Sequence, residues 1–299
     1  MGVLKRTAVL ALACALAASC SRFGQKDTKS GAQRIVCIGE QYNEFIYALG
    51  AQDNLVGVDY SSTYPPEIKK LTTVGYHRAL SAEGILSLHP TIIIDDNNIG
   101  PDNVVRQLKQ LGIPMKTFTA KDDSIEGAKA LLREMGGYFH KEQRAEELCA
   151  KIDKDMAAAA EMVKQYKDHP RVAVIHFGRA SNIYLVVGNG GGGDAGSAGQ
   201  MVEWAGGVMA IQKKGMERMA SPEVVAASNP DVILMTEFGF DRLGSADAAK
   251  ALPGVAETDA AKNNRIYRVT EHELMYYGPD TGENVMKVAK LIHTGASGQ

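Results

Sequence analysis

The sequence has few cysteines, no long hydrophobic run and no excess of positive charge. Its 4 cysteines show neither a zinc-type spacing nor a disulfide framework, and Cys37 and Cys149 are expected to be buried free thiols. The apolar run at residues 8–18 is about half the length needed to cross a bilayer. Without Lys5 and Arg6 the chain carries 31 basic and 35 acidic residues, a net charge of −4. We therefore expect no nucleic acid partner.

The sequence also lacks the side-chain patterns of common enzyme sites. No Ser-His-Asp order, paired carboxylates or metal-protease motif is present. Residues 188–193, GNGGGG, formally match a dinucleotide-binding fingerprint, but the loop runs on to Ser197 and residues near Lys213 are basic and helical where an acidic strand end is needed. A flexible rim loop is the better interpretation. An α/β oxidoreductase that uses this loop is a remote alternative, and we expect no catalytic activity.

The N-terminus has the features of an export signal. Lys5 and Arg6 precede the apolar run, and residues 1–19 contain no acidic residue, which predicts a secretory signal peptide. Residues 16–20, LAASC, resemble a bacterial lipobox in which Cys20 is lipidated; an ordinary signal-peptidase site is the alternative. Acyl chains would hold the protein on a membrane. We expect a membrane-anchored lipoprotein in the periplasm or cell envelope, with residues 20–33 as lipidated terminus and tether.

A helix, a proline and a buried strand follow one another twice, 140 residues apart. Glu83 stands seven residues before Pro90, and Glu223 stands seven residues before Pro230. In each copy the glutamate falls in the first helical turn, where acidic residues are favoured for electrostatic reasons alone. That capping interpretation is the alternative for either glutamate. The repeated arrangement indicates two lobes of like fold, each presenting one acidic residue at an equivalent position.

Strand and helix patterns alternate on both sides of one long helical segment, which predicts parallel sheets covered on both faces. Residues 141–166 keep one apolar face and span about 39 Å at ~1.5 Å per residue, enough to connect two lobes. The predicted fold is α/β, with two lobes built on central parallel-type sheets and joined by one long rigid helix. The predicted parts are an N-terminal lobe at residues 34–140, a bridging helix at 141–168 and a C-terminal lobe at 169–299.

Three stretches carry a resemblance to a known family. Residues 34–49, RIVCIGEQYNEFIYAL, followed by GA and LVGVD, resemble the opening of substrate-binding proteins of metal-chelate ABC importers, which bind siderophores, vitamin B12 and haem. Residues 74–88, VGYHRALSAEGILSL, and 251–269, ALPGVAETDAAKNNRIYRV, are most similar to the haem-binding members. The resemblance covers residues 34 to 292. It implies the class III periplasmic-binding-protein fold and delivery of haem to a permease and its ATPase.

The resemblance also implies roles for single residues. In that family the tyrosine of the VGY segment is an axial ligand of haem iron and falls on Tyr76, and a supporting arginine falls on Arg78. The equivalents of Glu83 and Glu223 dock onto basic residues of the permease, one from each lobe. Ferric iron is a hard Lewis acid that suits a phenolate, and a nearby guanidinium favours the ionised form.

Alternatives remain open at these positions. Tyr76 can be an aromatic half-buried on a loop, and His77 is a rival ligand; since adjacent loop residues usually point in different directions, we expect Tyr76 to face the cleft. His176, after the strand pattern VAVI, is a candidate second ligand or a loop histidine bonded to backbone.

Two further residues complete the predicted site, and the ligand itself has alternatives. Arg179 is a candidate partner for a haem propionate or is simply exposed, and Tyr276 is expected to pack on the porphyrin face. A corrinoid or a ferric siderophore on the same scaffold is the alternative to haem.

Overall fold

A computed structural model describes residues 33–119, 124–179, 182–187, 196–211, 215–219 and 223–293. The chain divides into residues 1–33 and residues 34–299, and the second of these units is described below. The predicted signal peptide, Cys20, most of the tether and the glycine-rich stretch at 188–193 lie outside the described residues.

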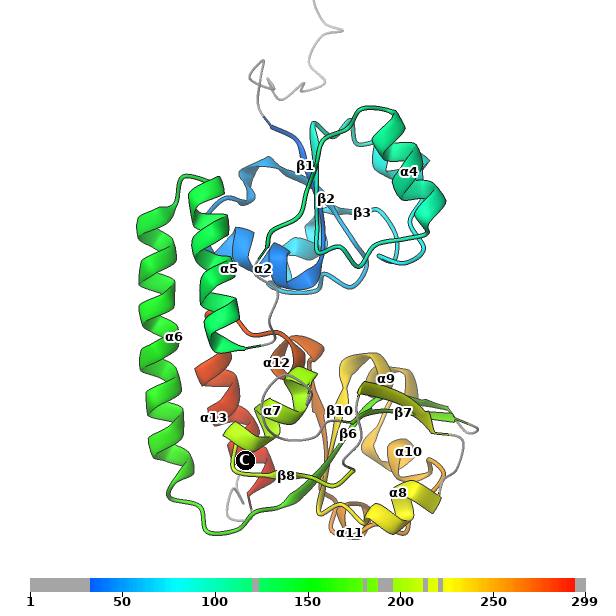
Figure 1. Cartoon of the computed structure of the whole chain (residues 1–299). Helices are drawn as coiled ribbons and strands as arrows, with labels where there is room; N and C mark the ends of the chain where they lie inside the picture. The colour runs from blue at the N-terminus through cyan, green and yellow to red at the C-terminus, as the bar shows by residue number, and fades with distance from the viewer. Residues whose placement is uncertain are drawn as a thin grey trace, which may run out of the picture. The chain divides into compact units, whose positions relative to one another are not determined.

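The N-terminal lobe (Figure 1) is built on a five-stranded parallel sheet. Its strand order is β3-β2-β1-β4-β5. Its strands are β1 (Ile35–Ile38), β2 (Leu55–Val58), β3 (Thr72–Thr73), β4 (Ile92–Asp95) and β5 (Met115–Lys116). Every residue of β1 and β4 is buried, as expected for central strands covered on both faces. The buried strand predicted after Pro90 is thus confirmed as β4.

Helices cover both faces of this sheet because side chains alternate along each strand. Ile35 and Cys37 pack into one apolar cluster, which contains Phe45, whereas Val36 belongs to a second cluster with Ile85. The helices are α2 (Glu40–Ala48), α3 (Ala82–Leu86), α4 (Asp102–Gln110) and α5 (Ile125–Tyr138), with short 3-10 turns at Gln52–Asn54 and Pro66–Lys70.

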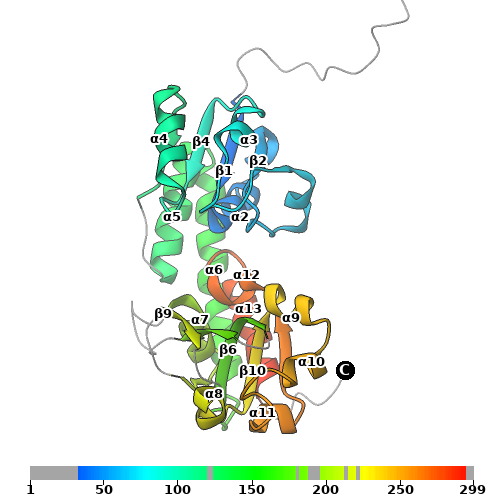
Figure 2. The same cartoon turned by 90° about the vertical axis from the view of Figure 1, so that its right-hand side faces the viewer.

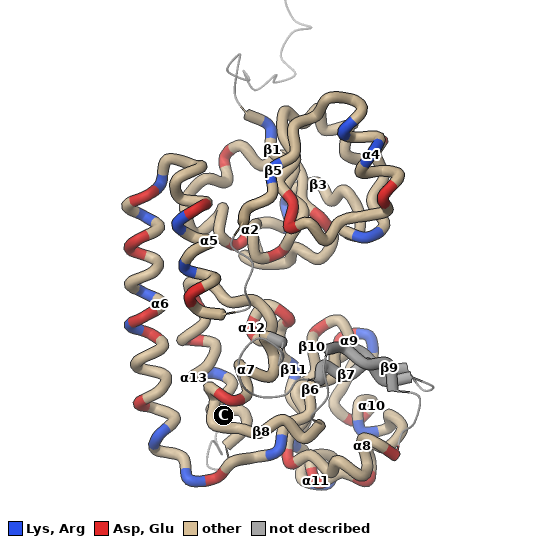
Figure 3. The backbone as a smooth tube through the Cα atoms, viewed as in Figure 1, with Lys and Arg blue, Asp and Glu red and all other residues tan. Residues whose placement is uncertain are grey.

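One long helix, α6 (Glu142–Val163), connects the two lobes. Its 22 residues span about 33 Å at ~1.5 Å per residue, somewhat less than predicted. It packs on α5 of the N-terminal lobe and on α13 (Thr281–Ile292) of the C-terminal lobe, as Figures 1 and 2 show. Acidic and basic residues are interspersed along it (Figure 3). Cys149 on its buried face and Cys37 in β1 are buried free thiols, as predicted.

The C-terminal lobe has a six-stranded mixed sheet in the order β11-β10-β6-β7-β9, with β8 paired to β6. Its strands are β6 (Arg171–Arg179), β7 (Asn182–Val187), β8 (Val208–Met209), β9 (Gly215–Met219), β10 (Val232–Thr236) and β11 (Ile266–Val269). Strands β6, β8, β10 and β11 are parallel, but β7 is antiparallel to both β6 and β9. Only residues 180 and 181 separate β6 from β7, and a parallel pair needs a crossover of a dozen or more residues.

Besides α13, the described residues of this lobe form six further helices. They are α7 (Gly196–Trp204), α8 (Glu223–Ser228), α9 (Glu237–Leu243), α10 (Ala246–Lys250), α11 (Asp259–Lys262) and α12 (Glu271–Met275). Helix α12 has a capping box, in which the side chains of Thr270 and Glu273 each accept from the backbone N–H of the other. Among the residues described, no helix has the length and apolarity of a membrane span.

Candidate functional site

Residues from both lobes line a cavity of about 420 Å³, here called the cleft cavity. The N-terminal lobe contributes Tyr60, Ser61, Tyr76 and His77. The C-terminal lobe contributes His176, Phe238, Arg242, Glu271 and Tyr276. This volume lies within the range of roughly 300–1,000 Å³ that is typical of small-molecule sites.

Tyr76 is held at the cavity by a loop between β3 and α3 whose backbone is fixed at several points. The carbonyl of Gly75 accepts from the N–H of Tyr60 at 2.8 Å, and the carbonyl of His77 accepts from Gly100 at 2.8 Å. Gly75 has φ 107, a backbone angle that favours glycine. Tyr76 is 48% exposed and lines the cavity, so its phenol is accessible to a ligand there.

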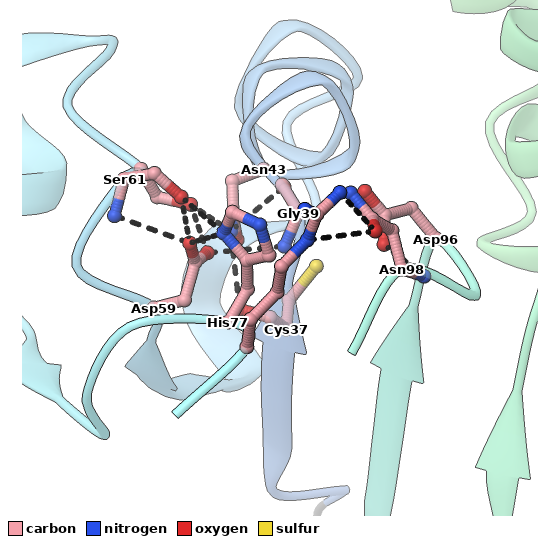
Figure 4. Close-up of polar contacts among 10 residues, drawn as sticks. Cys37, Gly39, Asn43, Asp59, Ser61, His77, Asp96 and Asn98 are labelled. Carbon is pink, nitrogen blue, oxygen red and sulfur yellow. Dashed lines mark hydrogen bonds and ion pairs between the residues drawn. The ribbon is translucent and has the colours of Figure 1, made fainter. Parts of the chain in front are cut away.

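His77 also lines the cavity, so both residues of the Tyr-His pair contribute to its wall. The two rings lie 4.2 Å apart, centre to centre. The Nδ1 atom of His77 is 3.3 Å from the hydroxyl of Ser61, which donates to the buried carboxylate of Asp59 (Figure 4). Burial lowers the pKa of His77, which favours the neutral imidazole. A carboxylate behind an imidazole is the arrangement that orients metal-binding histidines.

Arg78 points to a neighbouring loop of the same lobe. Its guanidinium donates to Oδ1 of Asn98 from Nε at 3.2 Å and from a terminal nitrogen at 2.9 Å. Asn98 follows β4, and its backbone N–H donates to Asp96. In the described part of the chain the hydrogen-bond acceptor of this guanidinium is Asn98, and support of Tyr76 by Arg78 stays a prediction.

His176 lies inside strand β6, not in a loop after the strand as the sequence pattern suggested. The pairing of β6 with β7 shifts register between Ile175 and Phe177, and such a bulge redirects the side chain of the residue within it. The Nδ1 atom of His176 is 4.0 Å from Glu271, and its carbonyl accepts from Thr236 at 2.5 Å. Burial, then the charge of Arg242, lowers the pKa of His176.

Tyr276 lines the cleft cavity, and its packing on a porphyrin stays a prediction. Its neighbour Tyr277 is buried and donates to the carbonyl of Ser197 at 2.8 Å. Tyr276 also borders a second cavity of about 250 Å³ lined by Gly39, Asp96 and others. Burial strongly raises the pKa of the Tyr276 phenol. The backbone of Arg179 pairs with Asn182 in β7, but its side chain lies outside the described residues.

Sequence patterns did not predict several residues that line the cleft cavity. Arg242 and Phe238 lie on α9, a short helix with no clear periodic signal, and Glu271 begins α12. Burial, followed by the charge of Glu237, raises the pKa of Glu271 to about 7. The capping box of α12 is the one local sequence signal that could have marked this segment.

Glu83 and Glu223 occupy equivalent positions in the two lobes. Each is exposed and lies in the first turn of a short helix, α3 or α8, that precedes a buried strand. The side chain of Ser81 accepts from Gly84 and caps α3. The corresponding Ser221 lies outside the described residues.

Comparison with known proteins identifies the family. A family model described as "Periplasmic binding protein" matches residues 35–272. The chain belongs to the periplasmic binding protein family. Members of this family are non-catalytic. This periplasmic binding protein is the substrate-binding component of an ABC importer, which implies a permease as its partner.

Solved structures and curated relatives carry different ligand names. The periplasmic heme-binding protein RhuT from Roseiflexus sp. RS-1 is 32% identical with a TM-score of 0.78 and covers 88% of this chain and 98% of its own. A substrate-binding lipoprotein, YvrC of Bacillus subtilis, is 27% identical over 270 residues, 89% of this chain and 81% of the relative. The vitamin B12-binding protein of Pectobacterium carotovorum is 32% identical over 114 residues, 38% of this chain and 41% of that protein.

Proposed function

We propose that this periplasmic binding protein binds haem in the cleft cavity and delivers it to the permease of an ABC importer. The observation that carries the proposal is the meeting of the Tyr76 phenol with the imidazoles of His77 and His176 on the wall of a single cavity. Tyr76 and His77 come from one lobe and His176 from the other. Groups on opposite lobes can reach the two faces of a metal chelate held between them.

Ferric haem needs an axial donor that the porphyrin does not supply. The phenol of Tyr76 offers a hard oxygen ligand, and iron favours its ionised form. His176 offers a nitrogen from the opposite lobe. The aromatic rings of Tyr60, Phe238 and Tyr276 provide apolar surface for the porphyrin faces.

The chemistry of the wall favours haem over a corrinoid. A corrin such as vitamin B12 carries its own axial ligands on cobalt, so it gains little from a phenol and two imidazoles at the cavity. The structural neighbours named as heme-binding cover 88% of this chain, whereas the vitamin B12-binding relative matches 38% of it. A corrinoid is the second candidate ligand because of that sequence match.

Three further roles belong to the same proposal. Arg242 on the cavity wall supplies positive charge for the haem propionates, and the same role for Arg179 rests on the sequence alone. Glu83 and Glu223, exposed on separate lobes, dock the permease. Lipidated Cys20 anchors the chain to a membrane of the cell envelope.

Titration with hemin tests the proposal. Wild-type protein is expected to bind hemin and to show a high-spin ferric spectrum with a phenolate charge-transfer band. Tyr76→Phe keeps the ring but removes the oxygen, so it should lose that band and bind hemin at least about tenfold more weakly. Iron-free protoporphyrin should bind both proteins equally, because it has no metal to ligate.

The controls separate the alternatives. Tyr47→Phe, at a tyrosine outside the cleft cavity, should bind hemin as wild type does. Unchanged affinity and spectrum in Tyr76→Phe would assign the iron to His77 or His176 instead. Saturable binding of cyanocobalamin without binding of hemin would refute the haem assignment and leave the corrinoid.

A further inference from the structure

A second cluster of polar side chains lies outside the cleft cavity, where the two lobes meet. Glu44 on α2 belongs to the N-terminal lobe, His272 on α12 to the C-terminal lobe, and Asp280 directly precedes α13. One ligand atom from each lies within 4.8 Å of the other two. We call these three residues the junction cluster. Glu44 is 3% exposed and His272 is 4% exposed, so two of its three side chains are buried.

The buried atoms of the junction cluster lack hydrogen bonds. Both carboxyl oxygens of Glu44 and both ring nitrogens of His272 are buried and, among the described residues, have no hydrogen-bond partner. Leaving one such group unsatisfied costs roughly 1–3 kcal/mol. Four such atoms on two facing side chains would be a large cost, and the simplest way to remove it is a ligand that contacts both.

The spacing of the two side chains suits a metal ion better than a direct hydrogen bond. Oε2 of Glu44 lies 3.4 Å from Nδ1 of His272, longer than the 2.7–3.2 Å of an ordinary hydrogen bond. Two ligands at ~2.0–2.1 Å from a tetrahedral zinc ion stand about 3.3 Å apart. The observed separation therefore matches one edge of such a coordination shell.

Neighbouring residues hold the three side chains in place. The hydroxyl of Tyr64 donates to Oδ2 of Asp280 at 2.7 Å, and its ring stacks on that of His272 at 3.7 Å. Gly278 lies against Glu44, because a Cβ at that position would come within 2.4 Å of Oε1. Partners of this kind, which fix the orientation of ligating groups, accompany metal sites in proteins.

The net charge around the junction cluster also favours binding of a cation. Lys151 contacts Oδ1 of Asp280 at 3.2 Å and would by itself repel a cation. However, Lys151 is also paired with Asp155 at 2.9 Å and Glu283 at 2.7 Å. Its single positive charge is thus outnumbered by three carboxylates before Glu44 is counted, and the junction stays favourable for a cation.

We propose that Glu44, His272 and Asp280 form a three-ligand site for a divalent cation of the zinc class at the junction of the two lobes. One imidazole with two carboxylates is a donor set suited to Zn²⁺. A bound ion would link α2 directly to α12 and to the start of α13, and would restrict movement of one lobe against the other.

Calorimetric titration of the tag-free protein with zinc chloride tests this site. Wild type is expected to bind one Zn²⁺, and Glu44→Gln and His272→Gln should each weaken binding by more than about tenfold. His169→Gln is the matched control, since this exposed histidine of the same lobe lies away from the junction cluster, with its Nδ1 3.1 Å from the carbonyl of Gly206. Its zinc affinity should equal that of wild type.

Crystals of wild-type protein grown with zinc provide a measurement that needs no variant to fold. An anomalous difference peak between Glu44 and His272 at the zinc absorption edge is the expected result. The proposal is overturned if no peak appears there, or if zinc binds the two glutamine variants as tightly as wild type. In that case Glu44 is protonated and hydrogen-bonds weakly to His272. Hemin binding does not enter either measurement, so the two proposals stand or fall separately.

Discussion

Glu40, in the first turn of α2, is a carboxyl group that folding removes from water. It is 3% exposed, and Oε2 has no hydrogen-bond partner among the described residues. Burial, then the charges of Glu271 and Glu237, raises its pKa from 4.5 to about 10. Between these two pH values the folded protein keeps a proton that the unfolded chain releases, so its contribution to stability falls as the pH rises.

Replacing Glu40 by glutamine should remove this pH dependence. Glutamine has nearly the same shape and is neutral in both states, so Glu40→Gln should gain stability over wild type as the pH rises from 5 to 8, by more than about 1 kcal/mol. Urea unfolding at the two pH values measures the gap. Glu257→Gln, at an exposed glutamate, should show no such widening. An equal gap at both pH values would mean that Glu40 is ionised in the folded protein.

Functional residues that lie in one local motif could be predicted from the sequence, whereas residues that only the fold brings together could not. Tyr76 lies in a stretch whose residue types and order resemble a known family, and it lines the cleft cavity, but its role as an iron ligand stays a prediction. Glu44 and His272 are separated by 227 intervening positions, and no spacing rule connects them. Whether a buried carboxyl meets an imidazole depends on how two helices approach, which side-chain patterns along one segment do not specify.

Among the elements, the contact between α6 and α13 is unusually close. Gly282 on α13 faces the backbone of Asp155 on α6, and a Cβ there would lie 2.4 Å from the Asp155 carbonyl carbon. Real side chains do not approach backbone so closely, so a methyl group would force the helices apart. The glycine therefore sets the distance between α6 and the C-terminal lobe.

Gly282→Ala should consequently destabilise the protein by about 1–3 kcal/mol, the usual cost of overpacking. Gly137 in α5 is a matched control, because a Cβ at that position would meet nothing within 4 Å and alanine is the better helix former. Gly137→Ala should be neutral or slightly stabilising. Thermal unfolding of both variants measures the difference, and a neutral Gly282→Ala would show that the two helices can separate at little cost.

Long elements could be predicted from periodicity, and short ones could not. The apolar face of α6 repeats over many turns, so its existence followed from the sequence even though its end lies three residues earlier than expected. Helices α9 to α12 have four to seven residues, too few for a periodic face to emerge. The antiparallel direction of β7 follows from the short connection between β6 and β7. The general alternation of strands and helices instead predicted a parallel sheet.

For the whole molecule, the proposed permease contacts come from both lobes at once. If Glu83 and Glu223 dock on basic residues, Glu83→Gln and Glu223→Gln should each weaken binding to the importer in nanodiscs while hemin binding stays intact. The loss should shrink at high salt, because exposed ion pairs are screened. Glu67→Gln, at another exposed acidic residue of the N-terminal lobe, should have no effect. Loss of hemin binding in either docking variant would place that residue in the ligand site instead.

The apolar cluster around α6 does not stop at the boundary between the lobes. It includes Phe45 of the N-terminal lobe, Ile152 of α6 and Val288 of the C-terminal lobe, all buried and connected through contacts. Heat should therefore melt both lobes in one cooperative transition, with calorimetric and van't Hoff enthalpies that agree. Two resolved heat-capacity peaks would contradict this. An isolated lobe, cut off from α6, would expose half of a shared interior to water and should not persist as a folded fragment.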